Sequence, residues 1–154
     1  MNSRKIIAAS FIALSTLTLT SCTAAGKDAP TSKIKQVTDG VEGDIGGVKI
    51  RGLVLVGQGD GNAHLVATIV NQDAESDAIA SISAGGTAVK LSGESALNQN
   101  APVTFGGASA NAGGVVALAA TPSTFVPVTV TLASGGAATL NAIVVEKSGA
   151  YANS

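Results

Sequence analysis

The chain has 154 residues, of which nine are basic and ten are acidic, and its formal net charge is −1. This near balance, without any basic run, argues against nucleic acid as a partner. The single cysteine excludes an intrachain disulfide, so the fold has to be held together by packing. The length is sufficient for one domain with a hydrophobic core.

Residues 1–21 have the features of a bacterial signal peptide. Arg4 and Lys5 are followed by an apolar stretch from Ile6 to Leu19. A membrane-spanning helix needs about 20 apolar residues. Because this stretch is shorter, it is typical of a segment that directs export and is then cleaved.

The apolar stretch ends in Leu-Thr-Ser-Cys at residues 19–22. This sequence resembles the bacterial lipobox, in which the cysteine thiol receives a diacylglycerol, the chain is cut before the cysteine and the new amino group can be acylated as well. The resemblance implies a lipid anchor on Cys22 and a location on the extracytoplasmic face of the cell membrane. Two acyl chains would hold the protein stably, whereas one holds it only marginally. An ordinary secretory signal with a chance cysteine is the alternative.

The chain after the signal is expected to divide into three parts. Residues 22–46 are predicted to be the lipidated cysteine and a flexible linker, because they are mostly small or polar and lack apolar periodicity. Residues 47–147 are predicted to form the folded domain. Residues 148–154 are predicted to be a disordered tail.

Short apolar segments separated by glycine-rich or polar turns indicate β-strands throughout the predicted domain. The expected strands are 48–56, 64–70, 78–84, 87–91, 103–105, 115–119, 126–132 and 138–146. The first two flank the glycine-rich turn 57–62 and are expected to pair as a hairpin. Since no segment after the signal has helical apolar spacing, the pattern predicts an all-β fold with a single antiparallel β-sandwich.

The segment 126–132 shows the clearest alternation of apolar and polar residues. Its valines and Leu132 fall on one face, and Pro127 and the two threonines fall on the other. This pattern is typical of a strand with one buried face. Because Pro127 lacks an N–H group, we expect either an edge strand or a strand that starts close to the proline.

Two parts of the domain carry a family resemblance. The strand 126–132 reads Val-Pro-Val-Thr-Val-Thr-Leu, and a glycine pair and a valine-rich segment follow it at 135–136 and 140–145. Earlier in the chain, an acidic loop follows Asn71 between two strands. Together these features resemble the periplasmic copper-chaperone domains of the PCuAC type and the actinobacterial lipoproteins related to them. The resemblance covers roughly residues 45–146 and implies an immunoglobulin-like or cupredoxin-like sandwich.

The copper ligands of that family are missing from this sequence. The family holds Cu(I) with a cluster of histidine and methionine, since soft ligands select this ion. This chain has one methionine, Met1, which lies in the signal, and one histidine, His64. Where the family has its second His/Met pair, residues 111–118 read Asn-Ala-Gly-Gly-Val-Val-Ala-Leu. No copper ligand is therefore carried over to any residue, and we expect no metal site and no cofactor.

Other candidate sites have weaker sequence support. The oxygen-bearing residues that could serve a hard cation such as Ca²⁺ are Asp60, Asn62, Asp73, Glu75 and Asp77. Their spacing is not that of an EF-hand, and the last three are typical of a solvated acidic loop. The sequence has no G-x-S-x-G nucleophile elbow and no glycine loop before a helix, so an enzyme is the least favoured class.

Two functional classes remain after these exclusions. The first is a membrane-anchored extracytoplasmic lipoprotein that acts as a non-enzymatic binding or interaction module, with a cell-envelope protein as partner. The second is a metal-handling lipoprotein, the copper role that the family resemblance implies. The lack of a second histidine and of any methionine beyond the signal favours the first class.

Overall fold

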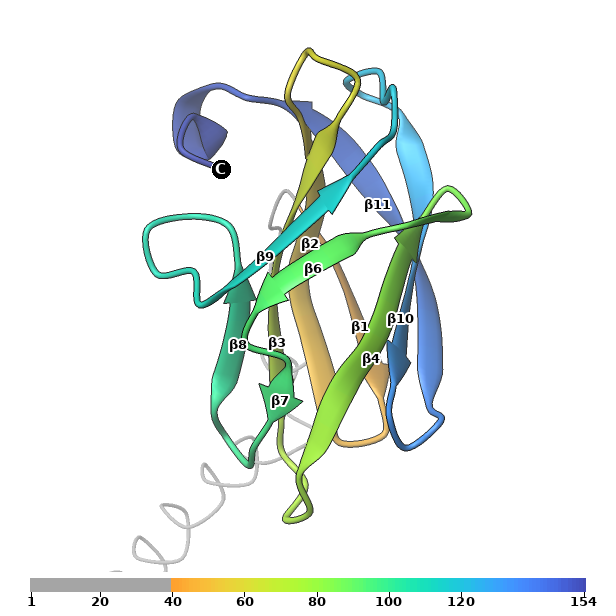
Figure 1. Ribbon diagram of the computed structural model, residues 1–154, viewed down its shortest axis with the longest axis vertical. Helices are drawn as coiled ribbons and strands as arrows, with labels where there is room; N and C mark the ends of the chain where they lie inside the picture. The colour runs from red at the N-terminus through yellow and green to blue at the C-terminus, as the bar shows by residue number, and fades with distance from the viewer. Residues whose placement is uncertain (1–39) are drawn as a thin grey trace, which may run out of the picture. The chain divides into compact units, whose positions relative to one another are not determined.

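The computed structural model describes residues 40–154, so Cys22, the signal segment and most of the predicted linker lie outside the described residues. The described part is an all-β domain, which confirms the predicted fold class (Figure 1). Its strands are β1 (Val41–Ile45), β2 (Val48–Gly57), β3 (Ala63–Asn71), β4 (Asp77–Ala84), β5 (Thr87–Ala88), β6 (Lys90–Gly93), β7 (Ala96–Leu97), β8 (Pro102–Phe105), β9 (Ala112–Val116), β10 (Phe125–Leu132) and β11 (Ala137–Glu146). One short 3-10 helix, η2 (Gly149–Tyr151), follows the last strand. None of the described helical segments is long and apolar enough to cross a membrane.

The strands form a sheet that folds over into two layers. Hydrogen-bonded neighbours follow the order β5-β4-β10-β11-β2-β3-β8-β9-β6, with β1 added to β2 and β7 added to β4. Most pairs are antiparallel, as predicted, but β11 runs parallel to β2, and β8 meets β9 in parallel at one residue pair. β4, β10 and β11 lie across the core from β3, β8 and β9 (Figure 1).

The core lies between the two layers and is built from side chains at alternate strand positions. On β3, every second residue from Ala63 to Asn71 is buried. On β10, Val128, Val130 and Leu132 are buried and Val126 is half-buried against the core, which confirms the predicted inward row. The largest fully buried side chains include Phe105, Ile50, Leu53, Leu55, Leu65, Ile69, Ile82 and Leu97. Removing this apolar surface from water is the main force that stabilises the fold.

Pro127 is the third residue of β10, which is a central strand. β10 pairs with β11 on one side and with β4 on the other, so the edge alternative is wrong. Pairing with β4 begins only at Val128, one residue after the proline. The missing N–H group therefore removes no hydrogen bond between β10 and β4. This agrees with the second predicted alternative, a proline close to the start of the strand.

The domain begins earlier than the sequence predicted. The segment 22–46 was expected to be linker, but Val41–Ile45 forms β1 on the edge of β2. Asp44 of this strand accepts hydrogen bonds from Lys49 at 3.0 Å and Arg51 at 2.7 Å. These partners lie across the hairpin, and the strand itself is short and glycine-containing. Its local sequence therefore carries little strand signal.

The predicted disordered tail is also wrong within the described residues. Gly149–Tyr151 forms η2, and the backbone oxygen of Ser154 accepts a hydrogen bond from Nε2 of Gln58 at 3.3 Å. Lys147 donates to Oε1 of the same glutamine at 2.7 Å. These bonds join the end of the chain to the loop after β2, a long-range contact that the polar composition of the tail does not reveal.

Two predicted strands have different bounds in the structure. The strand expected at 115–119 is β9, Ala112–Val116, because its glycines lie inside the strand. A Cβ at Gly114 would lie 3.0 Å from Cβ of Leu65 and 3.1 Å from Cγ1 of Val89, so the missing side chain allows close packing. The segment 87–91 is divided into β5 and β6, which pair with strands of different layers.

Candidate functional site

A cleft of about 740 Å³ opens at one end of the sandwich. It lies where the β1–β2 turn, the β3–β4 loop and the β10–β11 turn come together, at the lower end of Figure 1. Pockets that bind ligands commonly have volumes of about 300–1,000 Å³. The size of the cleft is therefore sufficient for a ligand, and its lining decides which chemistry it can accept.

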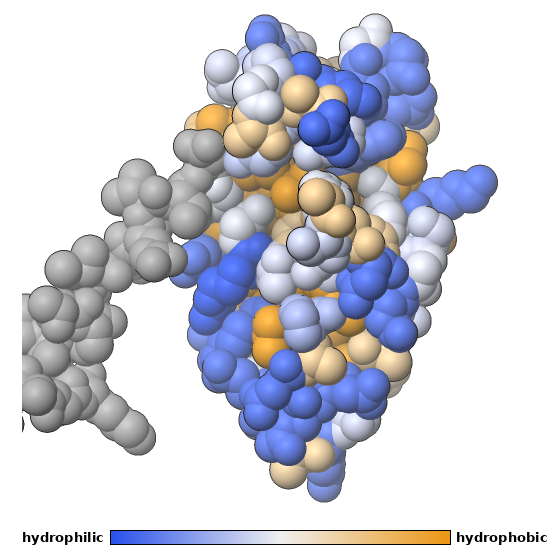
Figure 2. Space-filling model, turned by 90° about the vertical axis from the view of Figure 1, so that its left-hand side faces the viewer, coloured by the Kyte–Doolittle hydropathy of each residue, from blue (hydrophilic) through white to orange (hydrophobic). Residues whose placement is uncertain are grey.

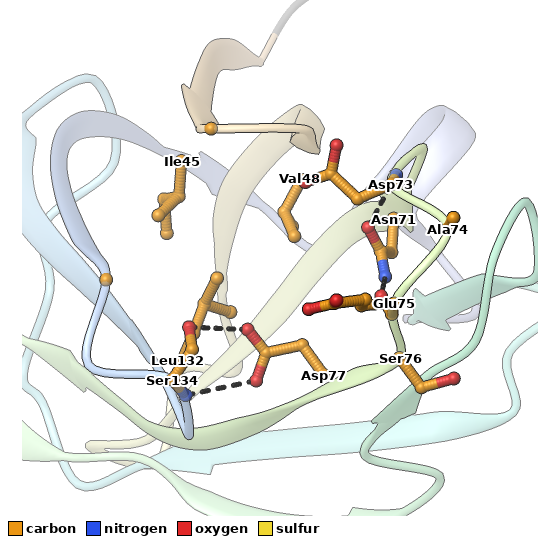
Figure 3. Close-up of a pocket in the computed structure, with 12 residues that line it drawn as sticks. Ile45, Val48, Asn71, Asp73, Ala74, Glu75, Ser76, Asp77, Leu132 and Ser134 are labelled. Carbon is orange, nitrogen blue, oxygen red and sulfur yellow. Dashed lines mark hydrogen bonds between the residues drawn. The ribbon is translucent and has the colours of Figure 1, made fainter.

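The lining combines apolar and acidic side chains. Ile45, Val48 and Leu132 contribute apolar surface from β1, β2 and β10. The acidic residues Asp73, Glu75 and Asp77 come from the β3–β4 loop and the first position of β4 (Figure 3). The lower end of the face shown in Figure 2 is mainly hydrophilic, with small apolar areas between polar residues.

Asn71 fixes the shape of the β3–β4 loop. It is the buried polar residue of the described domain, with 1% of its surface exposed. Its Nδ2 donates to the carbonyl oxygens of Glu75 at 2.7 Å and Leu97 at 3.0 Å, and its Oδ1 accepts from the N–H of Asp73 at 2.9 Å. With these three bonds the amide is well satisfied despite its burial. The buried amide of Asn71 therefore fixes the loop that carries the carboxylates of the cleft.

Asp73 joins two of the loops around the cleft. Its Oδ2 accepts a hydrogen bond from the N–H of Gly47, in the β1–β2 turn, at 3.1 Å. A Cβ at Gly47 would overlap the carboxylate of Asp73, so only glycine leaves room for this contact. The contact connects the β3–β4 loop to the β1–β2 turn on one side of the cleft.

Asp77 joins the β10–β11 turn to β4. Its Oδ2 accepts from the hydroxyl of Ser134 at 2.6 Å, and its Oδ1 accepts from the N–H of Ser134 at 3.1 Å (Figure 3). Its Oδ1 also accepts from the N–H of Ala78 at 2.7 Å. These bonds favour the ionised form, and the hydrogen bond from the Ser134 side chain is the largest cause that lowers the pKa of Asp77 below 3.8. Because its oxygens are already engaged, Asp77 supports the cleft and has little capacity left for a ligand.

Glu75 differs from its two acidic neighbours. Its carboxylate points into the cleft in Figure 3. Among the hydrogen bonds and ion pairs of residues 40–154, only its backbone oxygen takes part, as the acceptor from Asn71. The basic side chains of β2, Lys49 and Arg51, pair instead with Asp44. The carboxylate of Glu75 is therefore available to a ligand.

The structure separates the five predicted oxygen ligands into two groups. Asp60 and Asn62 lie in the loop before β3, where hydrogen bonds from Asn62 lower the pKa of Asp60. The other three lie in the region after β3, at the opposite end of that strand. Within residues 40–154, no three or more His, Cys, Asp or Glu side chains are grouped so that they could hold a metal ion.

His64 and the segment 111–118 do not form a site together with these carboxylates. His64 is a half-buried residue of β3, opposite Val56 on one side and Val115 of β9 on the other. The residues that sequence reasoning missed are Ser134 and the apolar lining of the cleft. The Ser134-Gly-Gly sequence predicted only a turn, and the contact with Asp77 depends on the pairing of β10 with β4. Cys22, the predicted lipid site, lies outside the described residues.

Comparisons with known proteins give a fold and no family assignment. Neither the protein-family models nor the curated proteins provide a match to this sequence. The copper-bound PCuAC domain from PmoF2 is structurally similar, with 21% identity, a TM-score of 0.58 and coverage of 69% of this chain and 98% of that domain. The apo PCuAC domain from PmoF1 is similar as well, with 17% identity, a TM-score of 0.59 and coverage of 69% and 99%. At these identities the likeness shows a shared fold, and it confirms the predicted resemblance to the PCuAC-type sandwich.

Proposed function

We propose that the protein is a membrane-anchored extracytoplasmic lipoprotein whose β-sandwich acts as a non-enzymatic binding or interaction module. The anchor is the lipid on Cys22, at the end of the lipobox-like sequence. The observation that carries the binding role is the cleft, which is lined by the free carboxylate of Glu75 and by the half-buried Ile45.

The anchor is tested by comparing Cys22→Ser with the wild type. Cells are labelled with a radioactive fatty acid and then fractionated. The wild-type protein should carry the label and stay with the membrane, and the variant should lose both properties because the thiol that accepts the lipid is gone. Equal labelling and equal membrane retention of the two proteins would refute the anchor.

The binding role is tested by capturing partners from native membranes. The lipidated wild type and the variant Glu75→Gln are each cross-linked in membranes and recovered. Glu146→Gln is a matched control, since Glu146 is an exposed acidic residue at the last position of β11. The proposal is supported if the wild type and the control both capture a partner that a chain without the β-sandwich does not capture. No enrichment would contradict it.

Copper handling is the second candidate function, and the fold likeness is the observation that favours it. The chemistry of the described residues opposes it. They contain no methionine and no cysteine, and His64 is their only imidazole. Cu(I) prefers thioether, thiolate and imidazole ligands over carboxylates. Metal analysis of the protein recovered from copper-supplemented cells separates the two candidates: about one copper per chain favours copper handling.

A further inference from the structure

The cleft offers two kinds of surface to a partner. Its apolar surface comes mainly from the half-buried Ile45, which packs against the core, whereas Val48 and Leu132 at the floor of the cleft are each only 3% exposed. Asp73 and Glu75 are exposed residues of the loop above this lining. A ligand that fits both surfaces has an apolar group next to positive charge.

The negative charge of the cleft is not balanced by basic side chains of the described domain. Lys49 and Arg51 form ion pairs with Asp44 on the neighbouring strand. Lys147 donates to Gln58 at the other end of β2, and Lys90 lies on β6 in another part of the sheet. Within residues 40–154, Asp73 and Glu75 form no ion pair, so these two carboxylates can pair with a cation from outside the domain, which gives charge complementarity to a basic partner.

The cleft is formed before any partner arrives. Asn71 holds the inner side of the acidic loop with three hydrogen bonds. Asp77 and Ser134 connect β4 to the β10–β11 turn on the opposite side. A preformed groove lowers the entropy cost of binding, because few side chains have to be ordered.

We infer that the cleft docks an extended segment of a partner protein in which an apolar side chain lies between two lysine or arginine residues. The inference rests on the proposed function as a binding module and specifies its partner. The apolar side chain contacts the half-buried Ile45 above the core residues Val48 and Leu132, and the flanking cations pair with Glu75 and with the solvent-facing side of Asp73. A single small ammonium group would leave most of the 740 Å³ unfilled and the apolar lining in water. The described residues also lack a group of side chains suited to a metal ion.

The test measures binding of short labelled peptides to the full chain, purified in detergent, by fluorescence anisotropy at physiological salt. The probes are capped peptides with Val, Leu, Ile or Phe between two lysines or two arginines. One control set has serine at the apolar position, and another has glutamate at the basic positions. The best basic-apolar peptide should bind about tenfold more tightly than its serine counterpart, and the glutamate peptides should not bind.

The variant Glu75→Gln should weaken binding of the best peptide by about tenfold, because it removes a charge-assisted contact. Glu146→Gln removes an equal charge outside the cleft and should bind like the wild type. The inference would be overturned if both variants lost the same affinity, or if serine peptides bound as tightly as apolar ones. It would also be overturned if spermidine or Ca²⁺ displaced the peptide completely. The absence of binding by every basic-apolar peptide would overturn it as well.

Failure of the inference can be distinguished from failure of the proposed function. If Glu75→Gln still captures the same membrane partner as the wild type and no peptide binds, the docking inference is wrong and the binding module stands. If the wild type captures no membrane partner at all, the proposed function itself fails.

Discussion

Replacing Asn71 by leucine should destabilise the domain strongly, although the two side chains are similar in size. The substitution removes the amide that serves the carbonyls of Glu75 and Leu97 and the N–H of Asp73. The bond to Leu97 is buried, and loss of a buried partner costs about 1–3 kcal/mol. The other two groups are part-buried and can reach water, so we assign about 0.5–1 kcal/mol to each. The expected loss is about 2–5 kcal/mol, against a total stability of about 5–15 kcal/mol.

Urea unfolding of residues 31–154 measures this loss. The control is Gln72→Leu, an exposed neighbour whose substitution should change the free energy of unfolding by less than about 0.5 kcal/mol. Hydrogen exchange provides a second readout, because the N–H of Asp73 should exchange faster once Oδ1 of Asn71 is gone. If Asn71→Leu unfolds within about 0.5 kcal/mol of the wild type, the assigned role of Asn71 is wrong.

Three further predictions concern the core and the loops around the cleft. Val128→Asp should lower the free energy of unfolding by several kcal/mol, because it buries an unpaired charge. Thr129→Asp, on the outward face, should lower it much less, and equal melting temperatures of the two variants would contradict the assigned faces. The lowered pKa of Asp77 stabilises the fold above about pH 3.8, and this stabilisation is lost as the pH falls further and the carboxylate is protonated. Asp77→Asn lacks this carboxylate, so its melting temperature should fall less between about pH 6 and pH 2.5 than that of the wild type. Gly47→Ala should displace the carboxylate of Asp73 and shift its NMR signals, whereas unchanged signals would exclude the close contact.

The strands with strong alternation could be predicted from the sequence. The valine row of β10 was found because apolar and polar residues alternate along it, and the hairpin of β2 and β3 was found because a glycine-rich turn separates two apolar segments. β1 was missed because it is stabilised by cross-strand ion pairs of Asp44, and the two-residue β7 was missed because it is too short to show a period. The parallel pairing of β11 with β2 depends on how distant segments meet, and local patterns do not contain this information.

The candidate site was only partly visible in the sequence. The acidic loop after Asn71 was recognised as a family-like feature, but its carboxylates were considered only as weak cation ligands. The structure gives them different roles, since Asp77 is engaged by Ser134 and Glu75 is free. Those roles follow from contacts between β4, the β10–β11 turn and the β1–β2 turn. Spacing along the chain could not have distinguished them.

We propose that this sandwich of the PCuAC type, without thioether or thiolate ligands in its described residues, serves as a binding module and does not handle Cu(I). The most direct test is an anaerobic competition titration of residues 31–154 against a colorimetric Cu(I) chelator. His64→Ala is titrated alongside, because His64 is the one imidazole of the chain. We predict that neither protein removes copper from the chelator in stoichiometric amounts, since one imidazole without sulfur ligands binds Cu(I) weakly. Removal of one copper per chain by the wild type, lost in His64→Ala, would show instead that the domain handles Cu(I) through His64.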